Sequence, residues 1–184
     1  MIMRLNRRAL LAGTAAALAA PAVLRAQAEP IRLGALNPLT GAGGPYGPSM
    51  RKAIEGVIEA VNGAGGVNGR RVQLVGDDSQ TNPDAAVRAA RKLIDVDRVV
   101  AIMGTWASAV TTAVAPLCWE SKTMLFTVSG ADSITQLPHN GYIIRTQPNS
   151  TLQITKLAEF LGGDRGAKRI FILGAQTPFA LSNR

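Results

Sequence analysis

A glycine-rich segment early in the chain could close over a small ligand. Residues 37–53 read NPLTGAGGPYGPSMRKA, with Gly41, Gly43 and Gly44 inside four residues. The spacing does not fit a dinucleotide fingerprint, because Tyr46 occupies the position of the third glycine, and no Gly-Lys-Ser/Thr tripeptide indicates a Walker loop. A nucleotide-dependent enzyme is therefore disfavoured. Such glycines let the main chain approach a ligand closely, and Tyr46 could cover it.

Two further segments carry small hydroxyl residues at expected strand ends. Residues 104–112 read GTWASAVTT and place Ser108 where a helical pattern begins, so that free amides and the helix dipole favour a carboxylate there. The alternative is that Ser108 only caps its own helix. Residues 127–135 read TVSGADSIT, in which the hydroxyl and carbonyl of Ser129 could accept from an ammonium group. Together these groups fit an amino acid zwitterion.

Catalytic, metal and cofactor sites are not indicated. The only histidine, His139, lies in an expected surface loop, and no nucleophile elbow or set of metal-spaced ligands occurs. Asp77 and Asp78 are adjacent, so in a strand they point to opposite sides. We therefore expect neither an enzyme nor a bound cofactor.

Apolar runs alternate with helical patterns along the chain, which predicts a doubly wound α/β fold with a parallel sheet. Strands are expected at 31–36, 71–76, 98–104, 123–129, 142–146 and 168–174, and helices at 48–62, 83–94, 107–120 and 151–162, the last opened by a capping box at 150–153. Sheets of this kind bind ligands at the carboxyl ends of their strands. The loops at 37–47, 77–82, 104–108 and 129–133 should therefore share one rim.

The first 28 residues have the features of an export signal. Arg4, Arg7 and Arg8 precede an apolar stretch, and Ala26-Gln27-Ala28 is a small-x-small cleavage site. NRRALLA resembles the twin-arginine pattern, and ordinary Sec export is the alternative. We expect a periplasmic protein that begins at Glu29 and has no stable membrane insertion after cleavage.

Charge and aromatic content argue against nucleic-acid binding. Four arginines lie in residues 1–28, and without them the formal charge falls from +8 to +4. The remaining bases are scattered among acids, and the aromatic residues are spaced singly, so no stacking platform is expected. The one cysteine, Cys118, lies in an apolar helical stretch and is expected to be buried.

An ordered series of motifs resembles one family. PLTGAGGPYGPSMRKAIEGVIEAVNGAGGVNGRRVQLVGDDSQTNPDAAVRAARKLI, then VVAIMGTWASAVTTAVAP and TMLFTVSGAD, resemble the branched-chain amino acid (Leu/Ile/Val) periplasmic binding proteins, the substrate-binding components of ABC transporters. The resemblance covers roughly residues 30–175. It implies two α/β lobes that close on a small amino acid-like ligand, with membrane permease subunits as partners.

The resemblance also implies roles for four residues. Ser108 corresponds to the serine that binds the ligand carboxylate in the family, and Ser129 corresponds to a small residue that contacts the ligand. Ala131 occupies a position where the family has a threonine, and it lacks the threonine hydroxyl. An amide, urea or an aromatic acid is therefore the alternative ligand. Tyr46 matches an aromatic of the first loop, near the ligand side chain.

The expected domain organisation combines this resemblance with the export signal. We expect an export signal at 1–28, an N-terminal lobe at 29–148 and the start of a second lobe at 149–184. Members of the family are about twice as long, so the chain looks truncated, from a shortened or split gene, and a nonfunctional fragment is an alternative. Alone, it is expected to bind ligand weakly or not at all.

Overall fold

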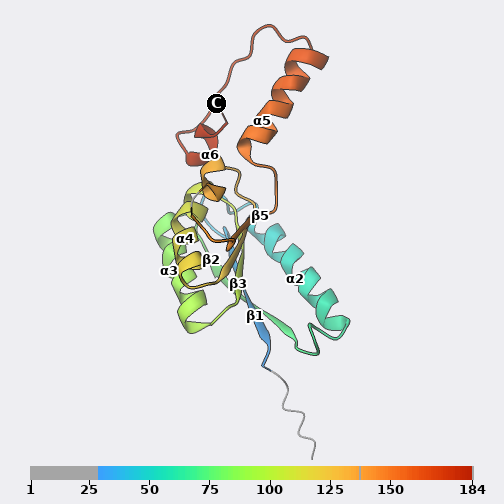
Figure 1. Ribbon diagram of the computed structural model, residues 1–184, viewed down its shortest axis with the longest axis vertical. Helices are drawn as coiled ribbons and strands as arrows, with labels where there is room; N and C mark the ends of the chain where they lie inside the picture. Colours follow the sequence, from blue (N-terminus) through green and yellow to red (C-terminus); the bar gives the residue numbers. More distant parts are fainter. Residues whose placement is uncertain (1–28, 137, 184) are drawn as a thin grey trace, which may run out of the picture.

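The computed structural model describes residues 29–136 and 138–183, so the expected export signal lies outside the described residues. Five parallel strands form one sheet in the order β2-β1-β3-β4-β5 (Figure 1). Their bounds are Ile31–Asn37 (β1), Val72–Asp78 (β2), Ala101–Thr105 (β3), Met124–Thr127 (β4) and Ile143–Arg145 (β5). The prediction of an α/β fold with a parallel sheet is confirmed.

The α-helices are α2 (Gly47–Gly63), α3 (Pro83–Arg91, continued by a π turn over Lys92–Val96), α4 (Ser108–Glu120), α5 (Ser150–Glu159, continued by a π turn over Phe160–Asp164) and α6 (Pro178–Leu181). Helices α2, α3 and α4 follow the first three strands and lie on the two faces of the sheet, whereas α5 and α6 follow the last strand and lie beyond the sheet edge (Figure 1). Helices α3 and α4 cover one face, and α2 covers the β1 and β2 part of the other. Because all strands run the same way, their carboxyl ends meet at one edge.

The main core lies between the sheet and helices α3 and α4. Leu36, Ile102 and Leu125 point into it from three strands and are fully buried against Leu93 and Val114. Four buried alanines let α3 lie close to both the sheet and α4 (Ala85, Ala86, Ala89 and Ala90). This packing fixes the position at which α4 begins.

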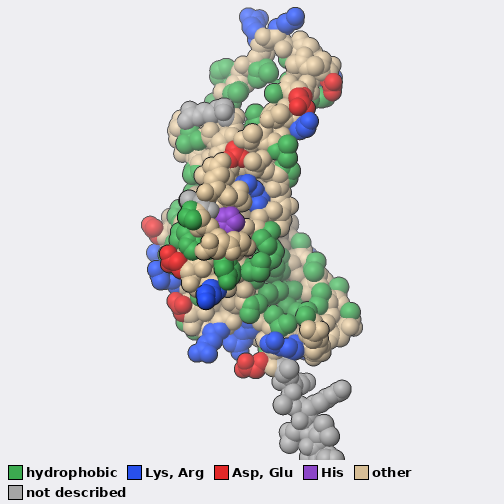
Figure 2. All heavy atoms as spheres, in the orientation of Figure 1, with side chains coloured by type: hydrophobic (Ala, Val, Ile, Leu, Met, Phe, Trp, Pro, Cys, Tyr) green, Lys and Arg blue, Asp and Glu red, His purple; other side chains and the backbone are tan. Residues whose placement is uncertain are grey.

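The opposite face of the sheet is only partly covered. Met103, Phe126 and Ile144 form a cross-strand row on that face and are half-buried. Figure 2 shows hydrophobic side chains on this side of the molecule, beside and along α2. None of the helices among the described residues is apolar over the length that a bilayer crossing requires.

Two local expectations are wrong. Helix α5 is capped by Asn149, whose side chain accepts from Leu152 N, because the Ser150 hydroxyl is buried and donates to Gly130 O at 3.0 Å. Residues 168–174 form no strand, since they have no strand neighbour among the described residues and their side chains are exposed, Phe171 by 89%. The α3 start is confirmed, with Asn82 accepting from Ala85 N at 2.9 Å.

Candidate functional site

A hollow of about 520 Å³ lies at the carboxyl edge of the sheet. The segments that follow all five strands contribute to it, and α5 and α6 lie beyond this edge (Figure 1). Its lining comprises Ala42, Thr81, Trp106, Ala107, Ser108, Ala109, Val128, Gly130, Gln147, Gln153, Thr177, Pro178 and Phe179. The expectation of a shared rim is confirmed, and none of these described lining residues carries a charge.

The start of α4 presents unpaired amides to this hollow. The first helical hydrogen bond runs from Thr111 N to Ala107 O, so the amides of residues 108–110 have no partner within the helix. No side chain caps this end, because Ala107 occupies the N-cap position. Ser108 and Ala109 line the hollow. The helix therefore offers hydrogen-bond donors and the positive end of its dipole to a carboxylate.

Ser108 is held by Ala131 rather than by its own helix. The Ser108 Oγ accepts a hydrogen bond from Ala131 N at 3.2 Å, and both residues are buried. The Ser108 hydroxyl proton has no acceptor among the described residues and is free to donate to a ligand. Ala131 contributes its main-chain amide to this arrangement, while its methyl group is fully buried.

Ser129 supports the loop between β3 and α4 instead of lining the hollow. Its hydroxyl donates to Trp106 O at 2.9 Å and shares a hydrogen bond with the Thr111 hydroxyl. Thr127 completes the buried network, since its hydroxyl donates to Thr105 O and accepts from Ser129 N. These hydrogen bonds fix the main chain at Trp106 and Ala107 relative to the end of the sheet.

Tyr46 contacts the site through Trp106. The two rings stack with centroids 5.0 Å apart and planes 24° apart. The sequence did not predict this pair, because the two residues are 60 positions apart and only the tertiary fold brings them together. A Cβ at Gly43 would lie 2.8 Å from the Trp106 ring, so this loop needs a glycine beside the indole. Tyr46 itself is 55% exposed.

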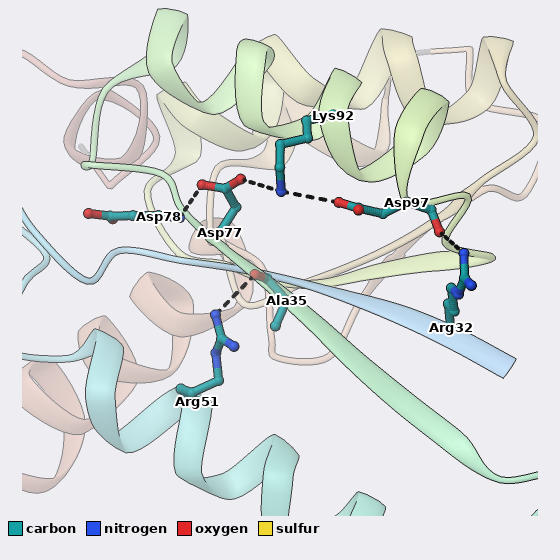
Figure 3. Close-up of polar contacts among 7 residues, drawn as sticks. All are labelled: Arg32, Ala35, Arg51, Asp77, Asp78, Lys92 and Asp97. Atoms are coloured by element: carbon teal, nitrogen blue, oxygen red, sulfur yellow. Dashed lines mark hydrogen bonds and ion pairs between the residues drawn. The ribbon is translucent and has the colours of Figure 1, made fainter. Parts of the chain in front are cut away.

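Asp78 anchors the glycine loop to the end of β2. Its Oδ1 accepts from Leu39 N at 2.8 Å and Thr40 N at 3.2 Å, and its Oδ2 from the Thr40 hydroxyl at 2.6 Å. Burial raises the pKa of Asp78, but these hydrogen bonds and one from Gln80 N outweigh it, so the net pKa lies below 3.8. Asp77 points the other way, toward Lys92, as Figure 3 shows.

Several lining residues were not predicted from the sequence. Trp106 directly follows β3, and an aromatic at a strand end in the expected rim could have identified it. Gln147, Gln153 and Phe179 come from segments whose position over the sheet is set only by tertiary packing. Of the four predicted residues, only Ser108 lines the hollow. The Ala131 amide donates a hydrogen bond to the Ser108 hydroxyl, and Tyr46 and Ser129 both contact Trp106. No group of three potential metal ligands occurs among the described residues.

Comparison with known proteins gives consistent matches. A family model described as periplasmic binding protein matches residues 30–184. The Leu/Ile/Val-binding protein homolog 8 of Brucella suis is 29% identical over 189 residues, covering 98% of this chain and 46% of that protein. The chain spans between 21% and 46% of the length of the curated relatives that it matches first.

Two crystal structures show the same fold over most of the chain. The leucine binding protein LivK from Thermotoga maritima is 26% identical with a TM-score of 0.74, covering 83% of this chain and 43% of that one. A solute binding protein of an ABC transporter from R. palustris, in complex with 4-hydroxybenzoate, is 25% identical with a TM-score of 0.70. The match covers 83% of this chain and 41% of that one.

Proposed function

Because the chain belongs to the periplasmic binding protein family, we propose that it forms the ligand site of a solute receptor for an ABC transporter of branched-chain or related amino acids. The family consists of binding proteins and not of enzymes. Under this proposal the protein is exported to the periplasm by the Sec or the twin-arginine route. There it delivers its ligand to the membrane permease subunits.

The observation that carries the proposal is the uncapped start of α4 beside Ser108. The free amides of Ser108 and Ala109 and the free hydroxyl proton of Ser108 lie at a hollow with no charged lining residue among those described. Such an environment stabilises a carboxylate, because its oxygens accept several hydrogen bonds and no acidic neighbour repels it. We assign the carboxylate contact to Ser108 and positioning roles to Ser129, Ala131 and Tyr46.

The lobe assignment remains part of the proposal. Residues 29–148 would form the first lobe and residues 149–184 the beginning of the second. The composition of the lining supports this division, since Gln153 and the segment Thr177–Phe179 face the hollow from beyond the carboxyl edge. A ligand would then lie between the two parts of the chain.

A second ligand class is favoured by the same lining. The ammonium group of an amino acid needs acceptors, and the described lining offers no carboxylate, only neutral oxygens such as those of Gln147 and Gln153. An aromatic monocarboxylate has no ammonium group to satisfy, and its ring would pack against Trp106 and Phe179. The R. palustris relative was crystallised in complex with 4-hydroxybenzoate, which is an aromatic monocarboxylate of this kind.

Calorimetric titration tests both candidates. The panel contains leucine, isoleucine, valine and 4-hydroxybenzoate, and the variants are Ser108→Ala and the control Ser121→Ala, which removes an exposed hydroxyl at the other end of α4. Ser108→Ala should weaken binding about 10- to 100-fold, as expected for one lost hydrogen bond to a charged group. Ser121→Ala should leave the affinity unchanged. Because the chain alone is expected to bind weakly, the titrations use high ligand concentrations. Equal affinities in the two variants would refute the assignment of the carboxylate contact to Ser108.

A further inference from the structure

Basic residues gather at the amino ends of the strands, at the opposite edge from the ligand hollow. Arg70 precedes β2, Arg32 lies near the start of β1, and Arg98 precedes β3. Since the sheet order is β2-β1-β3, three neighbouring strands each place one guanidinium at this edge. Figure 2 shows Lys and Arg side chains at the end of the molecule where the described chain begins.

The three arginines share one hollow of about 340 Å³. Its other lining residues are Glu29, Pro30, Ile31, Val96 and Val100. Val96 is 70% exposed and Val100 is 55% exposed, so the basic groups lie next to uncovered apolar surface. Glu29 is the one acidic side chain among these described residues, and three cations therefore face a single carboxylate.

The arginines are not neutralised by ion pairs. Arg32 Nη1 donates to the main-chain oxygen of Asp97 at 3.3 Å (Figure 3), and Arg70 Nε donates to the main-chain oxygen of Glu29 at 2.8 Å. Within residues 29–136 and 138–183, all ion pairs shorter than 4.0 Å use lysine. Because a guanidinium has five N–H donors, most donors at this edge remain available to a ligand.

Arg98 is held here by an unusual main-chain conformation. Its φ is +53°, in the left-handed region that non-glycine residues rarely adopt. The main chain on its carboxyl side is fixed by hydrogen bonds from Val99 N to Leu93 O and from Val100 N to Arg32 O. The second bond ties the Arg98 turn directly to the strand residue that carries another guanidinium of the cluster. A glycine would relieve the turn, yet an arginine occupies it.

We propose that Arg32, Arg70 and Arg98 form a binding site for a phosphate group. Guanidinium forks match phosphate oxygens in bidentate geometry, and three cations suit a group with up to two negative charges. The exposed valines would contact the apolar part of a phosphate ester. The phosphate could be that of a soluble ester or of a phospholipid headgroup, which share this chemistry. The site lies at the other edge from the carboxylate pocket and does not depend on the proposed transport function.

The test compares two double variants that remove the same charge. Arg70→Ala/Arg98→Gly removes two guanidinia of the cluster and relieves the left-handed turn, whereas Arg88→Ala/Arg91→Ala removes two exposed arginines from the last turn of α3. The full chain is titrated with inorganic phosphate by calorimetry at low ionic strength. It is also sedimented with vesicles of phosphatidylcholine, with and without phosphatidylglycerol. Circular dichroism checks the fold, and Arg70→Ala alone replaces the double variant if the double variant unfolds.

We expect the cluster variant to bind phosphate at least about tenfold more weakly than the wild type, while the α3 variant binds as the wild type does. Loss of phosphate binding alone would identify a soluble phosphate ester as the ligand class, and an accompanying loss of binding to the anionic vesicles would identify a lipid headgroup. The proposal is overturned if the wild type binds neither probe, or if both double variants weaken binding equally.

Discussion

Replacing Asp78 by alanine should loosen the glycine loop that borders the ligand hollow. The carboxylate receives hydrogen bonds from three main-chain amides and one hydroxyl, at distances between 2.6 and 3.2 Å. Each such bond contributes about 0.5–1.5 kcal/mol net, and these are partly exposed to solvent, so we expect a total loss of about 2 kcal/mol in the free energy of unfolding. Asp77→Ala is the matched control, because it removes the neighbouring carboxylate, which within the described residues accepts only one amide hydrogen bond, from Asp78 N at 2.9 Å, and pairs with the exposed Lys92.

The pH dependence provides a second readout of the same interaction. The pKa of Asp78 is lower in the folded protein than the usual value of 3.8. A carboxylate with a lowered pKa stabilises the fold above the unfolded pKa, and this contribution is lost as the pH falls through the folded pKa. The difference in unfolding free energy between wild type and Asp78→Ala should therefore be full at pH 7 and shrink below about pH 4.

Urea denaturation of the wild type and both variants at pH 7 and pH 3 measures these effects. Asp78→Ala should lower the midpoint at pH 7 much more than Asp77→Ala does, because exposed ion pairs contribute little. Equal shifts for the two variants, or an Asp78→Ala effect that does not change between the two pH values, would refute this account of how the loop is held.

Two glycine substitutions and one labelling experiment test local conformation and packing. Gly41→Ala should destabilise the protein and weaken ligand binding, because Gly41 has φ +75° and an added Cβ would overlap Gln80 O. Gly56→Ala is the control in the middle of α2, where an added Cβ meets no other atom, and it should stabilise the protein by about 0.5–1 kcal/mol. Thermal melts of both variants measure this, and a Gly41→Ala melt equal to that of the wild type would contradict it. Cys118 is buried and its pKa is raised to about 12 by burial, so a thiol reagent at pH 8 should label it only in denaturant. Rapid labelling of the native protein would show that α4 opens locally.

The sequence by itself determined the order and the type of most elements. Five of the six expected strands and all of the main helices occur close to their predicted bounds, because apolar runs and helical periodicity are local signals. The sixth, residues 168–174, has the composition of a strand but forms none. A strand requires a hydrogen-bonding neighbour, and composition does not say whether one is present.

The proposed carboxylate site could be predicted in part from the sequence, because helix starts are also local signals. A helix that starts after a strand presents free amides wherever it occurs, so Ser108 could be identified from its position alone. The roles of the other residues depend on long-range contacts. Ser129 bonds to Trp106 O and Ala131 N bonds to Ser108, so both act through neighbours that are distant in sequence.

Only the tertiary structure decided which residues gather around each hollow. Stacking of Tyr46 on Trp106 and the approach of Phe179 to the strand ends require the sheet order and the packing of α4 and α6. The arginine cluster has the same origin, because Arg32, Arg70 and Arg98 become neighbours only when β1 lies between β2 and β3. Residue type and periodicity act over a few positions and set the elements, whereas sites form from side chains that the fold brings together across the chain.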